Sequence, residues 1–331
     1  MESKTNQKEW NITIEQERKF WINILLGKFI NIPEVCIYCN KGNVNIRNNN
    51  SIINPVLGKC NNYLCNREKY LRIGTIFEPF NRTPASVIYN ILDLWLNNEF
   101  NAEKISTKLT SLYEVDKVNK AFILKVLKQF RVYIANYYRD LYSLETIAPR
   151  NGYNHIAIDE SLFTHCDGVQ QWVIGMINSE TNLIRLEVVE SRDTDTLKKI
   201  ITKHINVGNY VITDSWPGYT FLNNANSGYI HYTYNHSRGN FGSGLTSTSR
   251  IEAVWNELKG KFKRIYNTIK SKHFIYFLRE CEYRRSIKDL KSEDKMLNFS
   301  VLFSCVGIRT DDEYLSEKEL LSLDYETNFD D

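Results

Sequence analysis

The chain from Tyr153 to about residue 234 alternates between strand-like and helix-like patterns of hydrophobic residues. Three runs with strand periodicity come first, and the turn sequences between them predict consecutive hairpins. Helices and further strands then alternate, and Thr194 is the expected cap of the first of these helices. The predicted elements are strands at 155–160, 171–178 and 183–190, a helix at 194–205, a strand at 210–214, a short helix near 219–224 and a strand at 229–234. This pattern predicts an α/β domain with a mixed sheet.

Two acids stand at the ends of apolar runs in this domain. Asp159 follows the run 155–158, and Asp214 ends the strand that starts at residue 210. Open α/β sheets present their chemistry at such strand ends. Three antiparallel strands followed by alternating helices and strands are also the succession of a ribonuclease H-like fold, in which the first and fourth strands are neighbours. We therefore expect Asp159 and Asp214 to lie side by side.

A third acid, Glu252, stands near the start of a helical segment at 251–259. Two divalent cations about 3.5 to 4 Å apart can activate the nucleophile and stabilise the leaving oxygen in phosphodiester chemistry. Mg²⁺ takes hard oxygen ligands and keeps several waters, so three carboxylates suffice. We expect Asp159 to bridge two Mg²⁺ (or Mn²⁺) ions, and Asp214 and Glu252 each to complete one. Glu257 is the alternative third acid, and each acid taken singly could be a solvated surface charge.

Four of the seven cysteines are clustered near the N-terminus. Cys36 and Cys39 are separated by two residues, and Cys60 and Cys65 by four. Two thiolate pairs with such spacing predict one structural Zn²⁺ ion in tetrahedral coordination, as in a zinc ribbon. The alternative is four unrelated buried thiols.

Helical patterns surround and follow this cysteine block. An amphipathic helix is predicted within 9–31, and three more follow at 83–96, 101–110 and 120–138, the first with Thr83 as cap and a proline at its first position. The third of these helices carries several cations, which would give the bundle a basic surface. They are Lys120, Lys125, Lys128, Arg131 and Arg139. Such a bundle is typical of a helix-turn-helix DNA reader, although it could also be a plain connector.

The formal net charge of +3 conceals a strong asymmetry. The segment 311–331 has nine acids and one lysine, which is −8, and residues 1–310 therefore carry +11. A basic body suggests a polyanionic partner, although an excess of lysine can also serve solubility alone. No signal peptide or membrane-spanning run is evident, so we expect an intracellular protein, nuclear in a eukaryote and otherwise in the cytoplasm or nucleoid.

A basic stretch follows the segment that holds Glu252. It includes the candidate DNA-binding residues Lys259, Lys261, Lys263, Arg264, Lys270 and Lys272. These cations can follow a DNA backbone, giving affinity with little sequence selectivity, whereas a solvated helix face is the default interpretation. Trp216 could stack on a base or fill the core, and Trp255 shares a helix face with Glu252, where packing is its expected role.

Several sequence motifs together resemble DDE transposases of the Merlin type and their bacterial insertion-sequence relatives. They are the cysteine block ahead of Gly74-Thr-Ile-Phe77, Asp159-Glu-Ser, Trp172-Val-Ile-Gly175, Thr213-Asp-Ser-Trp-Pro-Gly-Tyr219, Asn235-His-Ser237, and Ile251-Glu-Ala-Val-Trp255 with Lys259. The resemblance implies cleavage at the inverted repeats of a mobile element and transfer of the freed 3′-hydroxyl into target DNA. It also implies a homo-oligomer on double-stranded DNA and an auxiliary role for His236. Many relatives have Asn where this chain has Ser249, which makes Glu252 the candidate third acid.

These observations predict five segments along the chain. They are an N-terminal helical segment at 1–33, a zinc ribbon at 34–80, a helical DNA-binding domain at 81–148, a ribonuclease H-like catalytic domain at 149–295 and an acidic tail at 296–331. Two other functions remain open from the sequence: a domesticated or inactive DNA-binding protein, and a nuclease that acts on RNA hybrids.

Overall fold

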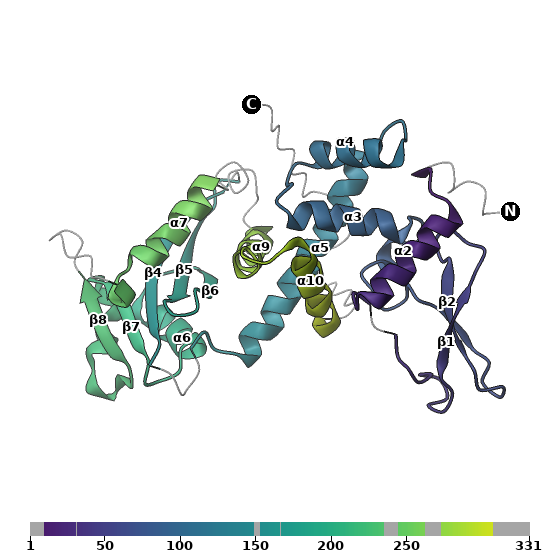
Figure 1. Cartoon of the computed structure of the whole chain (residues 1–331). Coiled ribbons are helices and arrows are strands. Elements are labelled where there is room, and N and C mark those ends of the chain that lie inside the picture. The colour runs from purple at the N-terminus through teal and green to yellow at the C-terminus, as the bar shows by residue number, and fades with distance from the viewer. Residues whose placement is uncertain are drawn as a thin grey trace. The chain divides into compact units, whose positions relative to one another are not determined.

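The computed structural model describes residues 10–30, 32–148, 153–165, 167–234, 244–261 and 273–306. It divides into two compact units (Figure 1). The first takes the chain up to Tyr133 and again from Asp289, and the second contains Ile134–Lys288. In the described residues no helix is long and apolar enough to cross a membrane.

The second unit is built on a five-stranded mixed sheet in the order β6-β5-β4-β7-β8. Its strands are β4 (His155–Thr164), β5 (Gln170–Asn178), β6 (Ile184–Val189), β7 (Tyr210–Asp214) and β8 (Ile230–Tyr234). β4, β5 and β6 pair antiparallel, while β7 lies parallel to both β4 and β8. The predicted mixed sheet is therefore confirmed, and its first and fourth strands are neighbours.

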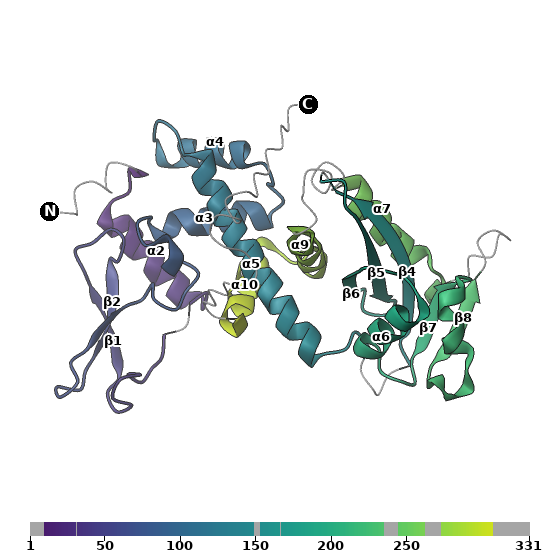
Figure 2. The ribbon, with the colours of Figure 1, turned by 180° about the vertical axis from the view of Figure 1, so that it is seen from behind.

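Alternating residues of the central strands face different helices, as the two-residue period of a strand requires. Ile158 and Met176 join the apolar cluster formed with Leu197 of α6 (Thr194–His204). Gly175, between Ile174 and Met176, instead lies against α7 (Ser249–Lys261), which contacts both β4 and β5. The views from opposite sides show α6 and α7 on the two faces of the sheet (Figure 2).

Two predicted helix caps are wrong by one residue. Asp193, not Thr194, caps α6, because its side chain accepts a hydrogen bond from the Thr196 amide at 2.8 Å. α3 (Ala85–Leu96) has Pro84 as its N-cap in place of Thr83. The Pro84 φ is −54°, as the proline ring requires, but its ψ of 142° is not helical, so the helix starts at Ala85. The first amide of α3 is instead capped by a residue distant in sequence: the buried Glu17 carboxylate accepts a hydrogen bond from the Ala85 amide at 2.7 Å.

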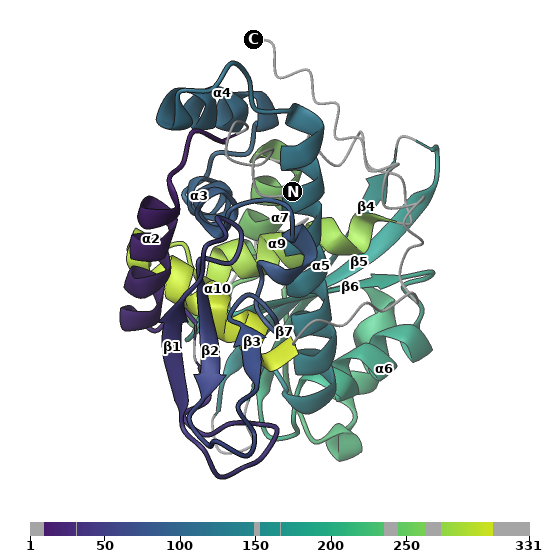
Figure 3. The ribbon, with the colours of Figure 1, turned by 90° about the vertical axis from the view of Figure 1, so that its right-hand side faces the viewer.

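The first unit combines a three-stranded antiparallel sheet with a group of helices. The strands β1 (Val44–Asn48), β2 (Val56–Cys60) and β3 (Glu68–Tyr70) lie side by side in Figure 3. The helices are α2 (Ile14–Leu26), α3, α4 (Ala102–Tyr113), the first part of α5 (Lys120–Leu144) and α10 (Ser292–Val306). Trp95, Phe130 and Phe299 pack together between α3, α5 and α10. α10 thus runs through the predicted boundary at 296.

One expected surface cation is inside this helical group. Arg131 of α5 is 8% exposed, and its guanidinium lies over the Trp95 ring at 5.8 Å. The predicted basic surface of the helical bundle therefore lacks Arg131.

The remaining described elements are one α-helix and four short 3₁₀ helices. They are α9 (Phe274–Ser286), η2 (Glu78–Phe80), η3 (Pro217–Asn223), η4 (Ala225–Ser227) and η6 (Gly244–Thr246).

A buried ionic network fastens α9 to the edge of the mixed sheet. Arg279 of α9 donates to both carboxylate oxygens of Glu282 at 2.8 and 2.9 Å and to the Leu186 carbonyl at 2.8 Å. Its side chain also ion-pairs with Glu187 of β6 at 3.5 Å. The Tyr142 hydroxyl of α5 donates to Glu282. The Arg279 guanidinium thus compensates the buried Glu282 carboxylate and adds to the charge balance of Glu187.

We expect Arg279→Met to destabilise the second unit by about 3–5 kcal/mol, because Met keeps the bulk but leaves the Glu282 carboxylate buried without its cation. The free energy of unfolding from urea titration measures this loss. Lys203→Ala is the control, because Lys203 also pairs with Glu187 but is 46% exposed, and its loss should cost less than about 1 kcal/mol. An equal loss in the free energy of unfolding for the two substitutions would show that Arg279 stabilises the second unit no more than an exposed ion pair does.

Candidate active site and cysteine cluster

Asp159 and Asp214 lie just beyond the paired part of two neighbouring parallel strands. The β4–β7 pairing runs from His155 with Tyr210 to Ala157 with Ile212, and each acid comes two residues after the last pair. The Asp214 carboxylate accepts a hydrogen bond from the Trp216 amide at 2.8 Å, which fixes it at the end of β7. The sheet therefore brings together the first two acids that the sequence singled out.

The helix α7 brings the third acid to the same region. Glu252 lies in its first turn, and Trp255 and Lys259 follow at three- and four-residue steps, so all three share one helix face. The Trp255 indole donates to the Asp159 carboxylate at 2.9 Å. The ring passes close over β5 because Gly175, the partner of Asp159 in the ladder, has no side chain. This hydrogen bond gives Trp255 more than the packing role expected from the sequence.

The charges of Asp214 and Glu252 act on Asp159. Burial raises the pKa of Asp159 to about 6, and the charges of Asp214 and Glu252 add to the increase. Burial also raises the pKa of the neighbouring Glu160 to about 7, with contributions from Asp159 and Asp214. Burial lowers the pKa of the Lys259 amine, and the negative charge of Asp159 acts in the opposite direction. A concentration of carboxylates that repel one another is a favourable setting for divalent cations.

The three carboxylates are less tightly gathered than the cysteines. Among the described residues, the cysteines alone place three or more candidate ligand atoms within 4.8 Å of one another. Asp159, Asp214 and Glu252 offer the hard oxygen donors that Mg²⁺ and Mn²⁺ require, so the donor chemistry fits such ions.

Gly175→Ala tests the contact that orients Asp159. An added Cβ would lie 2.5 Å from two ring atoms of Trp255, so we expect displacement of the indole and loss of its bond to Asp159. The overpacking should cost about 1–3 kcal/mol in the free energy of unfolding. Tryptophan fluorescence and thermal unfolding measure both effects. Gly260→Ala on α7 is the control, because no atom lies within 4 Å of its added Cβ, and a wild-type-like Gly175→Ala protein would contradict the expectation.

The four clustered cysteines have the geometry of a metal site. Cys36 and Cys65 have their sulfurs 3.8 Å apart, and those of Cys39 and Cys60 are 3.7 Å apart. A regular tetrahedron with Zn–S bonds of about 2.3 Å has edges of about 3.8 Å. The donor set and its spacing therefore fit a zinc ion, and all four predicted ligands are brought together.

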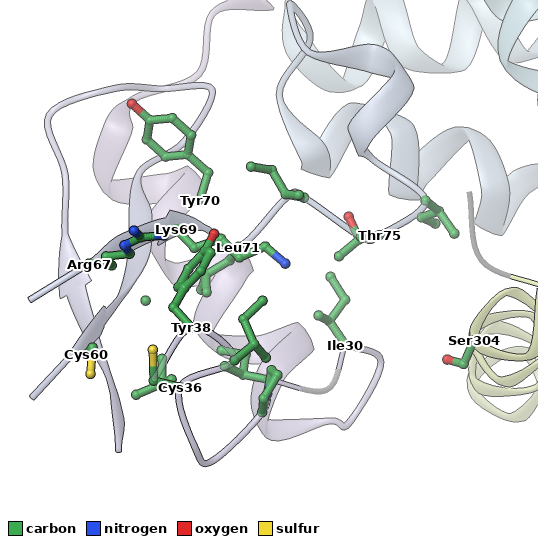
Figure 4. A pocket seen from close by; sticks show the side chains of 18 of the residues that line it. Ile30, Cys36, Tyr38, Cys60, Arg67, Lys69, Tyr70, Leu71, Thr75 and Ser304 are labelled. Atoms are coloured by element: carbon green, nitrogen blue, oxygen red, sulfur yellow. The ribbon is translucent and has the colours of Figure 1, made fainter. Parts of the chain in front are cut away.

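Backbone amides favour the charged form of two of these four sulfurs. The amide of Gly42 donates to the Cys39 sulfur at 3.4 Å, and the amides of Gly42 and Lys41 lower the pKa of that thiol to about 6. The Tyr38 amide likewise lowers the pKa of Cys36. A cavity of about 260 Å³ lies beside the cluster (Figure 4). Its lining includes Cys36, Cys60, Tyr38, Arg67, Lys69 and Ser304.

Comparison with known proteins identifies the family. A model of the ISXO2-like transposase domain matches residues 163–286, which include Asp214 and Glu252 and start just after Asp159. The chain is 30% identical over 119 residues to an uncharacterized transposase-like protein of Haemophilus influenzae, an alignment that spans 36% of this chain and 94% of that protein. The chain belongs to the ISXO2-like transposase family. The resemblance to bacterial insertion-sequence transposases is thereby confirmed.

The other predicted site residues of this transposase-family chain have different outcomes. Lys259 lies with its amine 5.2 Å from the Phe163 ring centre, close to Asp159. The remaining candidates lie outside the described residues or, for Lys261, have an undescribed side chain: His236, Lys261, Lys263, Arg264, Lys270 and Lys272. The acidic segment 311–331 is also outside them.

Sequence reasoning missed a second layer of polar residues in the transposase domain. The Tyr219 hydroxyl donates to the buried Glu160 carboxylate, and Arg192 approaches the same carboxylate at 3.9 Å. Glu160 directly follows Asp159, and Tyr219 is the last residue of the motif that contains Asp214, so both belong to motifs that the sequence had singled out. Arg192 lies in no motif, and only the fold brings it to this place.

Proposed function

We propose that this protein is a DNA transposase that cuts the ends of a mobile element and transfers them into target DNA. Asp159, Asp214 and Glu252 are its metal-binding catalytic residues. The observation that carries the proposal is that Asp159 of β4 lies where the charges of Asp214 of β7 and Glu252 of α7 both raise its pKa, within a chain of a transposase family. The strand order β6-β5-β4-β7-β8 supports a ribonuclease H-like fold for this domain.

The acids would hold two Mg²⁺ or Mn²⁺ ions, which supply an activated nucleophile and charge stabilisation at the scissile phosphate. The Trp255 indole orients the Asp159 carboxylate, and the Trp216 amide orients that of Asp214. Lys259 provides a cation on the same face of α7 as Glu252, where a DNA phosphate would be bound. These side chains are held by the sheet and by one helix, which keeps the carboxylates in place before DNA arrives.

The first unit supplies the DNA-binding part of this proposal. Cys36, Cys39, Cys60 and Cys65 hold one structural zinc ion, which would make residues 34–80 a zinc ribbon. The helices α3, α4 and α5 would contact the inverted repeats, and the basic stretch from Lys259 to Lys272 would follow the DNA backbone. Two or more copies would assemble on double-stranded DNA, since both ends of an element must be cut.

Cleavage of a defined duplex tests the proposal. The substrate is a 5′-labelled duplex that carries the terminal inverted repeat found beside the gene. We expect a nick at the repeat boundary with Mg²⁺ or Mn²⁺ that leaves a 3′-hydroxyl, and no nick with EDTA. Specific binding without a metal-dependent nick would instead identify a DNA-binding protein that has lost its chemistry. Preferential cutting of an RNA–DNA hybrid would identify a nuclease of another kind.

A further inference from the structure

Arg192 has an unusual position beside the carboxylates. It lies in the loop between β6 and α6, directly before the cap residue Asp193. Its guanidinium carbon is 4.4 Å from the ring centre of Trp172 and 3.9 Å from that of Trp216. Two indole rings in this range hold a planar cation by cation–π attraction and restrict its orientation. The guanidinium is therefore held in place, although Arg192 has a long side chain and lies in a loop.

This cation is connected to the acid site through Trp216. The Trp216 indole donates to the Arg192 carbonyl at 3.3 Å, while the Trp216 amide donates to the Asp214 carboxylate. The absence of a side chain at Gly218 leaves room for this indole, since a Cβ there would lie 2.8 Å from its nitrogen. One residue thus positions both Asp214 and Arg192.

A role in neutralising the Glu160 carboxylate does not account for the position of the Arg192 guanidinium. The closest approach of the two side chains is 3.9 Å, which is longer than a hydrogen bond, and Glu160 already accepts from Tyr219. The Glu160 side chain is 2% exposed, whereas that of Arg192 is 34% exposed. In the part of the chain that the structure describes, no hydrogen bond uses the guanidinium as donor. An arginine has five N–H donors in a plane, a geometry that matches phosphate oxygens.

We propose that Arg192 binds a backbone phosphate of the DNA strand that enters the active site. Glu160 and Asp159 are consecutive strand residues and point to opposite faces of the sheet. Arg192 therefore reaches the end of β7 from the α6 side, and it contacts a phosphate that flanks the scissile one. Arg192 is a positioning residue, and Trp172 and Trp216 hold it ready for the DNA. This inference rests on the proposed transposase function.

Salt dependence of DNA binding provides a readout that a purely structural role would not change. Each neutralised phosphate contributes about 0.9 to the slope of log Kobs against log salt concentration. We expect Arg192→Gln to reduce this slope by about 0.9 and to weaken binding of the inverted-repeat duplex by about tenfold or more. Arg192→Lys keeps the charge and should restore most of the slope. Lys198→Ala is the control, because Lys198 is an exposed cation of α6 and its loss should leave the slope nearly unchanged.

A double variant separates the phosphate contact from charge balance within the protein. If Arg192 only compensates Glu160, Arg192→Gln lowers the melting temperature but keeps the wild-type slope, and adding Glu160→Gln restores the melting temperature. We expect instead that the slope is reduced in Arg192→Gln and stays reduced when Glu160→Gln is added. A wild-type slope in Arg192→Gln, in a preparation whose wild type cleaves the duplex, would overturn the inference and leave the transposase function intact. Failure of the wild type to cleave would count against the proposed function.

Discussion

Asp214→Asn should reduce the rate of metal-dependent DNA cleavage by about a thousandfold or more, with nearly unchanged DNA affinity. Asn has the size of Asp and retains an oxygen that can accept the hydrogen bond from the Trp216 amide, so the end of β7 should keep its structure. It lacks the negative charge that a divalent cation requires. The bound metal ions stabilise the transition state by several kcal/mol, and each 1.36 kcal/mol that is lost lowers the rate about tenfold. Single-turnover cleavage of the labelled duplex measures it.

Glu257→Gln is the matched control for this prediction. Glu257 lies on the same helix as Glu252 but is 41% exposed and pairs with Arg285 at 2.9 Å. Its carboxylate therefore has a partner away from Asp159, and we expect a cleavage rate within about threefold of wild type. Wild-type cleavage by Asp214→Asn, or an equally large loss in Glu257→Gln, would be incompatible with the proposed set of acids.

Cys60→Ser should unfold the β1–β2–β3 sheet and abolish DNA binding by the first unit. The cluster that includes Cys60 substitutes for a hydrophobic core in a small polar module, whose exposed residues include Tyr63 and Leu64. Structural zinc contributes about 10–16 kcal/mol of apparent binding free energy in small modules, and this energy stabilises the fold. We expect the bound zinc to fall from one equivalent to well below one. Metal analysis and circular dichroism measure the two effects.

Cys305→Ser is the control for the cysteine chemistry. Cys305 of α10 is exposed and is distant in sequence from the four clustered cysteines, so its replacement should change neither zinc content nor folding. Removal of zinc from the wild type with a strong chelator should reproduce the Cys60→Ser spectrum. A folded, DNA-binding Cys60→Ser protein without zinc would contradict the structural role of the cluster.

Features with a local signal could be predicted from the sequence. Alternating apolar residues located all five strands of the mixed sheet, and their order placed Asp159 beside Asp214. The cysteine spacing located four sulfurs that meet within 4.8 Å. In each case, a short stretch of chain contains the information, because strand periodicity and ligand spacing are local properties.

Features that depend on long-range contacts could not be predicted in this way. Glu17 caps a helix that starts 68 residues later, and Arg279 contacts a carbonyl of Leu186 that lies 93 residues earlier. Arg131 looked like a surface cation, but a tryptophan of another helix covers it. Arg192 is likewise placed by two distant tryptophans. The partners of these side chains are set by the packing of whole elements, for which no local pattern exists.

The central claim is that Asp159, Asp214 and Glu252 form one divalent-metal site. Calorimetric titration of the zinc-loaded protein with Mn²⁺, comparing wild type with Glu252→Gln and Glu257→Gln, tests it most directly. We predict that Glu252→Gln weakens Mn²⁺ binding by about tenfold or more, because one charged ligand is lost, while Glu257→Gln binds as the wild type does. Equal Mn²⁺ affinity in all three proteins, or a loss confined to Glu257→Gln, would contradict the claim.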